Sequence, residues 1–304
     1  MREAQSNSLL GLKAPYINAG EMVNKGIEVS LAYNGYIQEG VFKGLSYNAG
    51  VFFDRTRNEL TKYGTDYIDS SKGLIYKEGL PYESYYGYEA IGIFKDEADV
   101  ANSPKQFNDK TLPGDIKYAD ISGPNGVPDG VVDENDRKVL DGRLPDFEYT
   151  VNLAASWKGF DLSAIFAYSI GGYIYNRDVT MILHNGSLEG RDWSTEILRR
   201  WTPDNRYTDV PALSTTSNNW NSASTRFLQN NSYMRLKNLT LSYNLPKQWI
   251  SKLSLSSVQV YVQGDNLFTI HRNQGLDPEQ GITGITYYRY PAMRTISGGI
   301  NLSF

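Results

Sequence analysis

Residues 147–170 read FEYTVNLAASWKGFDLSAIFAYSI, and this stretch decides the fold. Its first half carries apolar side chains at the odd positions Phe147, Tyr149, Val151, Leu153, Ala155 and Trp157. Its second half carries them at the even positions from Phe160 to Tyr168. Because successive side chains of a strand point to opposite faces, each half predicts a strand with one apolar and one polar face. Only Lys158-Gly159 links the two strands.

The same period of two recurs along the chain, so the predicted fold class is all-β. It predicts seven antiparallel strands near 26–34, 44–55, 146–157, 159–170, 233–245, 257–266 and 294–304. A soluble sandwich and a membrane barrel both produce this alternation. The polar faces carry small or amide side chains, and aromatic residues gather near strand ends, which favours the barrel.

The links between these strands alternate in length. Short links span 34–43, 158–159 and 246–256, whereas long ones span 55–145, 170–232 and 267–292. Outer-membrane barrels have short periplasmic turns and long outer loops, and such long loops are uncommon in compact soluble domains. Within the long links we expect a short helix near 193–201, ended by Pro203, and extra β-structure near 85–94.

Composition narrows the classes of function. The 304 residues include 13% aromatics, which argues against disorder, and the net charge of −4 argues against a nucleic-acid partner. Cysteine is absent, which removes disulfide scaffolds and Cys-based metal sites. No apolar run reaches about 18 residues, the length of a transmembrane helix. Residues 1–15 lack a signal-peptide pattern, so an exported protein would be represented here by an internal piece.

Short blocks in order along the chain resemble SusC/RagA-like TonB-dependent transporters. The most specific is 232–243, SYMRLKNLTLSY. The others are 24–31, 79–81, 86–88, 92–94, 113–116, 129–137, 200–203, 264–268 and the terminal Phe304.

The resemblance implies that 1–304 is the C-terminal part of a barrel of about 22 strands in the cell outer membrane, without its plug domain, TonB box or signal peptide. It further implies import of oligosaccharides or peptides, with a SusD-like surface lipoprotein as lid and TonB acting through the missing N-terminal part. Lipid would surround the barrel, and the chain would not be an enzyme.

Two other classes of protein compete with this interpretation. A soluble β-sandwich that binds carbohydrate explains the aromatics and loops, but not the alternating link lengths. A glycosidase needs two carboxylates at a defined separation, and the acidic residues are too common to nominate a pair. A Ser–His–Asp site would need His184 or His271, which we expect to be exposed and structural.

One window has the spacing of a calcium loop. The predicted ligands are Asn125, Asp129, Val131, Asp133 and Asp136, with Gly130 at the sharp turn. Two departures weaken the match: Val127 stands at the third position, and the last ligand is Asp rather than Glu. The alternative is a solvated acidic turn.

Three further expectations concern single residues. Arg235 and Lys237 occupy positions that are apolar further along their strand, which places them at the outer end, above the lipid. Phe304 ends an alternating strand, as in the signal read by the outer-membrane assembly machinery. Tyr85, Tyr86 and Tyr88 are expected to pack within a loop, with stacking on sugar rings as the alternative.

Overall fold

The structure is a computed structural model. It describes residues 2–3, 16–18, 20–107, 111–186, 188, 190–214, 223–250, 255–279, 284–286 and 290–304. Residues 4–15, on which the absence of a signal-peptide pattern mostly rests, lie outside this part.

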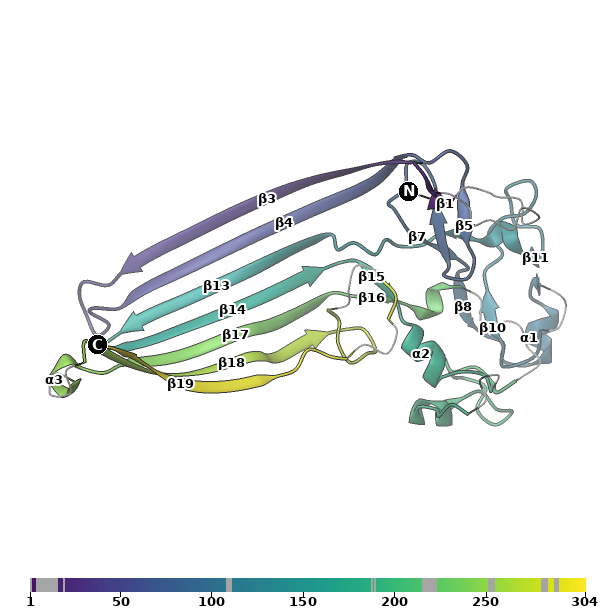
Figure 1. Cartoon of the computed structure of the whole chain (residues 1–304). Coiled ribbons are helices and arrows are strands. Elements are labelled where there is room, and N and C mark those ends of the chain that lie inside the picture. Colours follow the sequence, from purple (N-terminus) through teal and green to yellow (C-terminus); the bar gives the residue numbers. More distant parts are fainter. Residues whose placement is uncertain are drawn as a thin grey trace.

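Seven long strands form one antiparallel sheet, curved and inclined in Figure 1. They are β3 (Glu21–Tyr36), β4 (Ser46–Lys62), β13 (Phe147–Trp157), β14 (Phe160–Ile170), β17 (Tyr233–Asn244), β18 (Ser257–His271) and β19 (Thr295–Ser303). Each pairs with the next along the chain, so the sheet is an up-and-down meander. The seven predicted strands are therefore confirmed.

Three strands are longer than the period of two predicts. β3 begins at Glu21, β4 runs to Lys62 and β18 runs to His271. The extension of β18, LFTIH, lies beyond a shift in register, whereas in the extension of β4 charged and polar residues occupy both faces, as in 54–59, DRTRNE. Without an apolar face there is no period-two signal, although the backbone pairing continues from Glu21 to Lys62.

The short links lie at one end of the sheet. Lys158 (φ 50°) and Gly159 (φ 87°) both have positive φ, the requirement of the tight turn whose twist matches a β-hairpin. The link between β3 and β4 is closed by Ile37 N donating to Leu45 O at 2.9 Å. The third short link contains α3 (Lys247–Ile250).

The long links gather at the opposite end and build what we call the loop module, the described residues of 63–146, 171–232 and 272–292 (Figure 1). Its first link holds β5 (Tyr67–Asp69), β6 (Leu74–Tyr76), β7 (Ser84–Gly87), β8 (Ala90–Ile93), α1 (Glu97–Ala101), β9 (Lys105–Gln106), β10 (Ile116–Tyr118), β11 (Val131–Val132), η2 (Glu134–Asp136) and β12 (Lys138–Val139). Its second link holds β15 (Tyr173–Tyr175), α2 (Arg177–Ile182), η3 (Thr195–Arg199), η5 (Thr225–Phe227) and β16 (Leu228–Asn230). Two short strands near the N-terminus, β1 (Arg2–Glu3) and β2 (Tyr16–Ile17), pair with each other.

The expected β-structure near 85–94 is confirmed as β7 and β8. The expected helix near 193–201 is a single 3-10 stretch, η3, whose first turn is capped by Ser194 Oγ accepting from Glu196 N at 3.3 Å.

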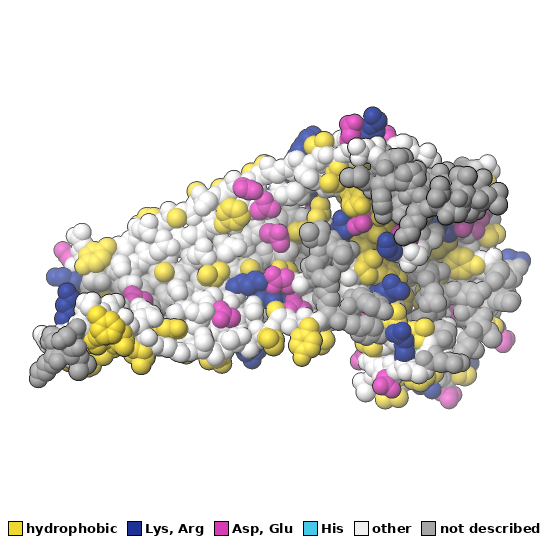
Figure 2. All heavy atoms as spheres, in the orientation of Figure 1, with side chains coloured by type: hydrophobic (Ala, Val, Ile, Leu, Met, Phe, Trp, Pro, Cys, Tyr) yellow, Lys and Arg dark blue, Asp and Glu magenta, His cyan; other side chains and the backbone are white. Residues whose placement is uncertain are grey.

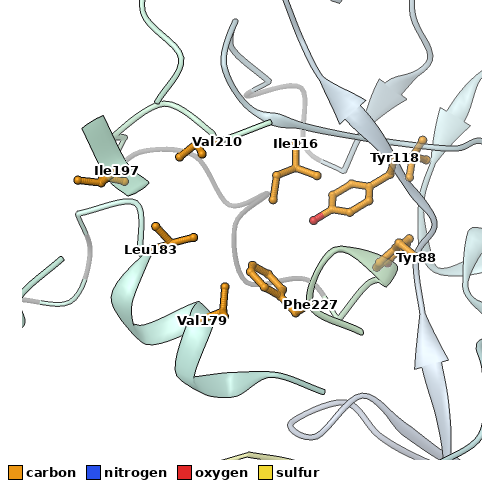
Figure 3. Packing of buried hydrophobic residues seen from close by; sticks show 9 residues of the cluster. Tyr88, Ile116, Tyr118, Val179, Leu183, Ile197, Val210 and Phe227 are labelled. Atoms are coloured by element: carbon orange, nitrogen blue, oxygen red, sulfur yellow. The ribbon is translucent and has the colours of Figure 1, made fainter. Parts of the chain in front are cut away.

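The hydrophobic core lies in the loop module rather than against the sheet. Among the described hydrophobic residues that are buried, only Leu60, Leu236 and Val258 belong to the seven long strands. The main cluster, shown in Figure 3, joins the first two long links: Tyr88, Ile116, Tyr118, Val132, Val179, Leu183, Ile197, Val210 and Phe227. The two links thus fold as one unit.

Candidate functional site

One face of the seven-stranded sheet is apolar and uncovered. Cross-strand neighbours form a continuous row through all seven strands: Tyr33, Ala49, Leu153, Ala164, Leu239, Gly264 and Ile296. Leu31 and Ile296 of this face are 68% and 71% exposed, so no second layer packs on it within the described part of the chain. In a sandwich this face would pack on a second sheet. An apolar band that is left bare is instead a surface for lipid.

The other face is polar and internally hydrogen-bonded. Asn48 Nδ2 donates to Asn34 Oδ1 at 2.6 Å, and Asn244 Nδ2 donates to Asp161 Oδ2 at 2.6 Å. In the view of Figure 2, hydrophobic side chains lie scattered over the sheet, with charged side chains between them. Such a face suits a water-filled interior.

Aromatic pairs flank the apolar band at both ends. Near the short links, Phe160 and Tyr243 lie 4.5 Å apart between ring centroids. Near the loop module, Tyr149 and Tyr168 stack at 4.3 Å. Phe304, by the short links, is 92% exposed. Aromatic girdles at the two interfaces of a bilayer have this arrangement.

The tyrosine cluster of the first long link packs inside the loop module. Tyr85 and Tyr88 are buried, whereas Tyr86 is half-buried. Burial raises the pKa of Tyr85, whose hydroxyl donates to the carbonyls of Tyr173 and Gly284 and so ties all three long links together. Burial likewise raises the pKa of Tyr175 to about 12. Tyr85 and Tyr88 are therefore packing residues and present no stacking surface.

Arg235 forms an ion network at the loop end of the sheet. Its side chain is 3% exposed, pairs with Asp277 and with Glu279 Oε2 at 2.7 Å, and donates to Thr269 Oγ1 at 2.9 Å. Lys237 Nζ reaches Glu279 Oε2 at 2.6 Å. Both residues lie at the end of β17 that meets the long links, and their expected position above the lipid stays a prediction; Arg235, however, is buried in an ion network and faces the polar side of the sheet.

A β-bulge explains the difference. In β17, Asn238 pairs with Ile165 and Leu236 with Phe166, so Lys237 is an extra residue. An extra residue reverses the alternation beyond it, and Arg235 therefore faces the polar side although its number is odd. The sequence signals that could have revealed the network are the two acids of the third long link, Asp277 and Glu279, which match the two basic residues in charge.

The predicted calcium ligands lie in one loop between β10 and β12. Asp136 is fully buried; its Oδ1 accepts from Ile121 N at 2.7 Å and Ser122 N at 3.0 Å, and its Oδ2 accepts from Asp133 N at 2.8 Å. Asp129 Oδ1 accepts from Val131 N at 3.0 Å.

Asp133 Oδ1 accepts from Asn135 N at 2.8 Å, so the loop holds its shape through bonds from carboxylates to its own backbone. Among the residues that the structure describes, no group of three or more His, Asp or Glu side chains lies close enough to hold a metal ion. Calcium binding by Asn125, Asp129, Val131, Asp133 and Asp136 stays a prediction.

The two histidines do not form a catalytic site. His184, expected to be exposed, is buried, because its ring stacks on Trp193 at 4.8 Å. Its Nδ1 accepts from Gly186 N at 3.1 Å. His271 is half-buried, with Nδ1 3.1 Å from Asn273 O. Neither ring forms a hydrogen bond to a serine or an acid among the described residues.

Of the large clefts in the described part of the loop module, one is built wholly from residues of the first two long links. Its volume is about 900 Å³, and it is lined by Ile93, Lys95, Asp99, Lys117, Arg199 and Tyr207 among others. Two of its cations pair with acids of the lining: Lys117 Nζ lies 2.8 Å from Asp99 Oδ1, and Arg199 Nη1 lies 3.4 Å from Asp209 Oδ1. Four basic residues line the cleft, Lys95, Lys117, Arg199 and Arg206, against two acids, Asp99 and Asp209, so the cleft is basic overall.

The described helices include none that is both long and apolar enough to cross a membrane. An antiparallel meander with one bare apolar face, one hydrogen-bonded polar face, aromatic ends and large loops on one side defines the class: part of a membrane β-barrel.

Comparisons with known proteins give the family. No protein-family model matches the chain. TonB-dependent receptor P3 of Formosa agariphila is 30% identical over 315 residues, which cover 97% of this chain and 30% of that protein. TonB-dependent receptor SusC of Bacteroides thetaiotaomicron is 24% identical over 302 residues, which cover 94% of this chain and 27% of that protein.

Solved structures agree. The RagAB peptide transporter matches with a TM-score of 0.80 and 28% identity, over 99% of this chain and 32% of that one. The RagAB peptide importer in its open-open state matches with a TM-score of 0.77 and 28% identity, over 100% of this chain and 31% of that one. The chain is therefore part of a SusC/RagA-like TonB-dependent transporter, and it spans about a third of the length of these relatives. The relatives are named as receptors and transporters, not as enzymes.

Proposed function

We propose that this chain forms part of the wall and outer loops of a TonB-dependent barrel in the outer membrane, which imports oligosaccharides or peptides. The match to RagAB over 99% of the chain carries the proposal. The bare apolar face supports a membrane location, and the polar face supports an aqueous interior.

The partners are proposed with the same support. A SusD-like lipoprotein would cover the loop module, and TonB would act through a part of the protein outside this chain. A soluble carbohydrate-binding sandwich accounts less well for the sheet, because Leu31 and Ile296 would be left in water.

Location is tested by fractionating cells that carry the full-length protein. We expect it in the outer-membrane fraction and, after extraction, in the detergent phase of a two-phase partition. Recovery in the buffer phase without detergent would support the soluble alternative.

Transport is tested by deleting the gene and measuring uptake of two probe sets, fluorescent peptides from a casein digest and fluorescent neutral oligosaccharides. Loss of uptake of one set, together with abolition by an uncoupler of the proton gradient, is expected for a TonB-driven importer and assigns the substrate class. Unchanged uptake of both sets would contradict import of either class. Affinity purification of the full-length protein should also retain a lipoprotein encoded next to it.

A further inference from the structure

The block 232–243 is the most distinctive part of the sequence, yet its two basic residues have no role in lining an apolar band. Both contact a single short piece of the third long link, Asp277–Glu279. Asp277 in turn holds its own segment: Oδ1 accepts from Glu279 N at 2.8 Å and Oδ2 accepts from Ala292 N at 2.6 Å.

The network lies on the polar face. Arg235 stands opposite Ala167 and Thr269 in the register, beyond the bulge at Lys237. Leu236, the next residue, stands opposite Phe166 and Phe268 on the apolar face. Residues 277–279 are therefore folded inward over the sheet rather than outward into solvent.

The loop module holds the same segment from its other side. Asn231 Nδ2 donates to Pro278 O at 3.0 Å, Asn273 Nδ2 donates to Asn231 Oδ1 at 2.9 Å, and Gln274 N donates to Gln229 Oε1 at 2.7 Å. A cavity of about 220 Å³ remains between Pro278, Glu279 and the sheet residues Glu148, Ser169 and Tyr233. The segment thus stands off the sheet and occupies space on its polar side.

We propose that Arg235 and Lys237 are positioning residues that hold residues 273–279 across the polar face and so narrow the barrel at its loop end. The proposal rests on the proposed function in one respect, that the polar face lines the transport path. A buried guanidinium with three partners fixes orientation in a way that a lysine cannot, because its planar fork binds two carboxylates at once. Leu276 of this segment is 80% exposed and lines a cleft together with Val179, Ile182 and Leu183 of the second long link.

The anchoring is tested by hydrogen exchange in the full-length transporter, purified in detergent. In Arg235→Gln and in Glu279→Gln the amides of Glu279 and Ala292 should exchange at least tenfold faster than in the wild type, with the smaller effect in Arg235→Lys. Arg57→Gln is the matched control, because Arg57 is also a strand residue paired with a loop acid, Asp146 at 3.0 Å, but is half-exposed. It should leave these amides unchanged.

Exchange in β17 and β18 shows whether a variant has merely unfolded the sheet. If Arg235→Gln fails to assemble, Glu279→Gln and Arg235→Lys still decide the question. Unchanged protection of Glu279 and Ala292 in the assembled variants would overturn the anchoring role and leave the proposed function intact.

The narrowing is tested with a reporter cysteine, since the chain itself contains none. Thr240→Cys places a thiol on the polar face below the network, in a full-length protein freed of any other cysteine. On intact cells, a maleimide attached to a large polyethylene glycol should react at least tenfold faster when Arg235→Gln is added, while a small maleimide reacts at similar rates in both. Equal rates of the large reagent with and without Arg235→Gln, whether fast or slow, would overturn the narrowing.

Discussion

At the scale of single residues, sequence reasoning failed where contacts come from residues that are not adjacent in the sequence. His184 is buried by Trp193, and Arg235 is buried by acids 42 and 44 positions away. Neither contact can be recognised from the residues adjacent to it in the sequence. In addition, the bulge at Lys237 reverses the alternation of apolar and polar residues that holds in the rest of β17. The sequence shows two basic residues in 235–237 and two acids in 277–279. That they pair can be inferred only when the register of the strands is known.

The calcium prediction belongs to this scale. Calorimetric titration of a piece spanning 112–142 should show saturable binding below about millimolar, the weak end for extracellular calcium modules. Asp129→Asn and Asp133→Asn should abolish the heat, because each removes the charge of one predicted ligand.

The control for this titration is magnesium, which requires a tighter octahedral site and should not compete. Absence of saturable heat would mean that the loop is an acidic turn closed by Asp136 and its three amide donors.

A second prediction concerns pH. Burial alone would raise the pKa of Asp277, but hydrogen bonds from Ala292 N and Glu279 N and the charge of Arg235 outweigh it and hold the pKa below its ordinary value. A lowered folded pKa stabilises the folded state above the unfolded value of about 3.9, and this contribution is lost as pH falls through the folded pKa.

Thermal unfolding of the full-length protein should therefore lose stability below about pH 4, the ordinary range of an aspartate. Asp277→Asn should be less stable at pH 7 and should show a flatter pH dependence. If wild type and variant respond to pH in parallel, Asp277 is not the group responsible.

At the scale of elements, the period of two located every long strand, because each must present one apolar and one polar face. It missed the extensions of β3, β4 and β18, because β4 is polar on both faces there and β18 continues beyond a shift in register. It also gave little information on the loop module, whose short strands and helices bury their residues through contacts between links.

Adjacent residues of β13 test the two faces directly. Leu153→Arg should reduce assembly of the full-length barrel, because Arg on the lipid face costs about 2–4 kcal/mol near the bilayer midplane. Asn152→Arg, one position away on the polar face, should be tolerated. Surface abundance by immunoblot of outer membranes measures both, and equal loss in the two variants would contradict the assignment of faces.

The C-terminal residue Phe304, which follows β19, gives a prediction about assembly of the barrel. Deleting it in the full-length parent should lower the amount of assembled barrel far more than uptake per assembled molecule, as expected for a residue read during assembly. Phe304→Tyr keeps the aromatic ring and should restore abundance. Unchanged abundance of the deletion variant would leave Phe304 only as an exposed girdle residue.

At the scale of the whole molecule, the buried hydrophobic cluster lies in the loop module, whereas the sheet buries few hydrophobic residues. The sheet leaves its apolar face bare, whereas the first two long links share one core and the third is tied to them through Tyr85 and Tyr175. Such a shared core explains how links of this length keep a defined shape above a barrel. It also keeps the three long links together at one end of the sheet, opposite the short links.

This arrangement predicts the topology. Short turns of outer-membrane barrels face the periplasm, so the loop module should face outward. Protease added to intact cells that express the full-length parent should cut within 56–145 or 170–232, at exposed sites such as the link containing Tyr207, which is 85% exposed. The links 35–43 and 246–256 should be cut only after the outer membrane is permeabilised. Cleavage of these short links in intact cells, with the loop module spared, would invert the sheet in the membrane.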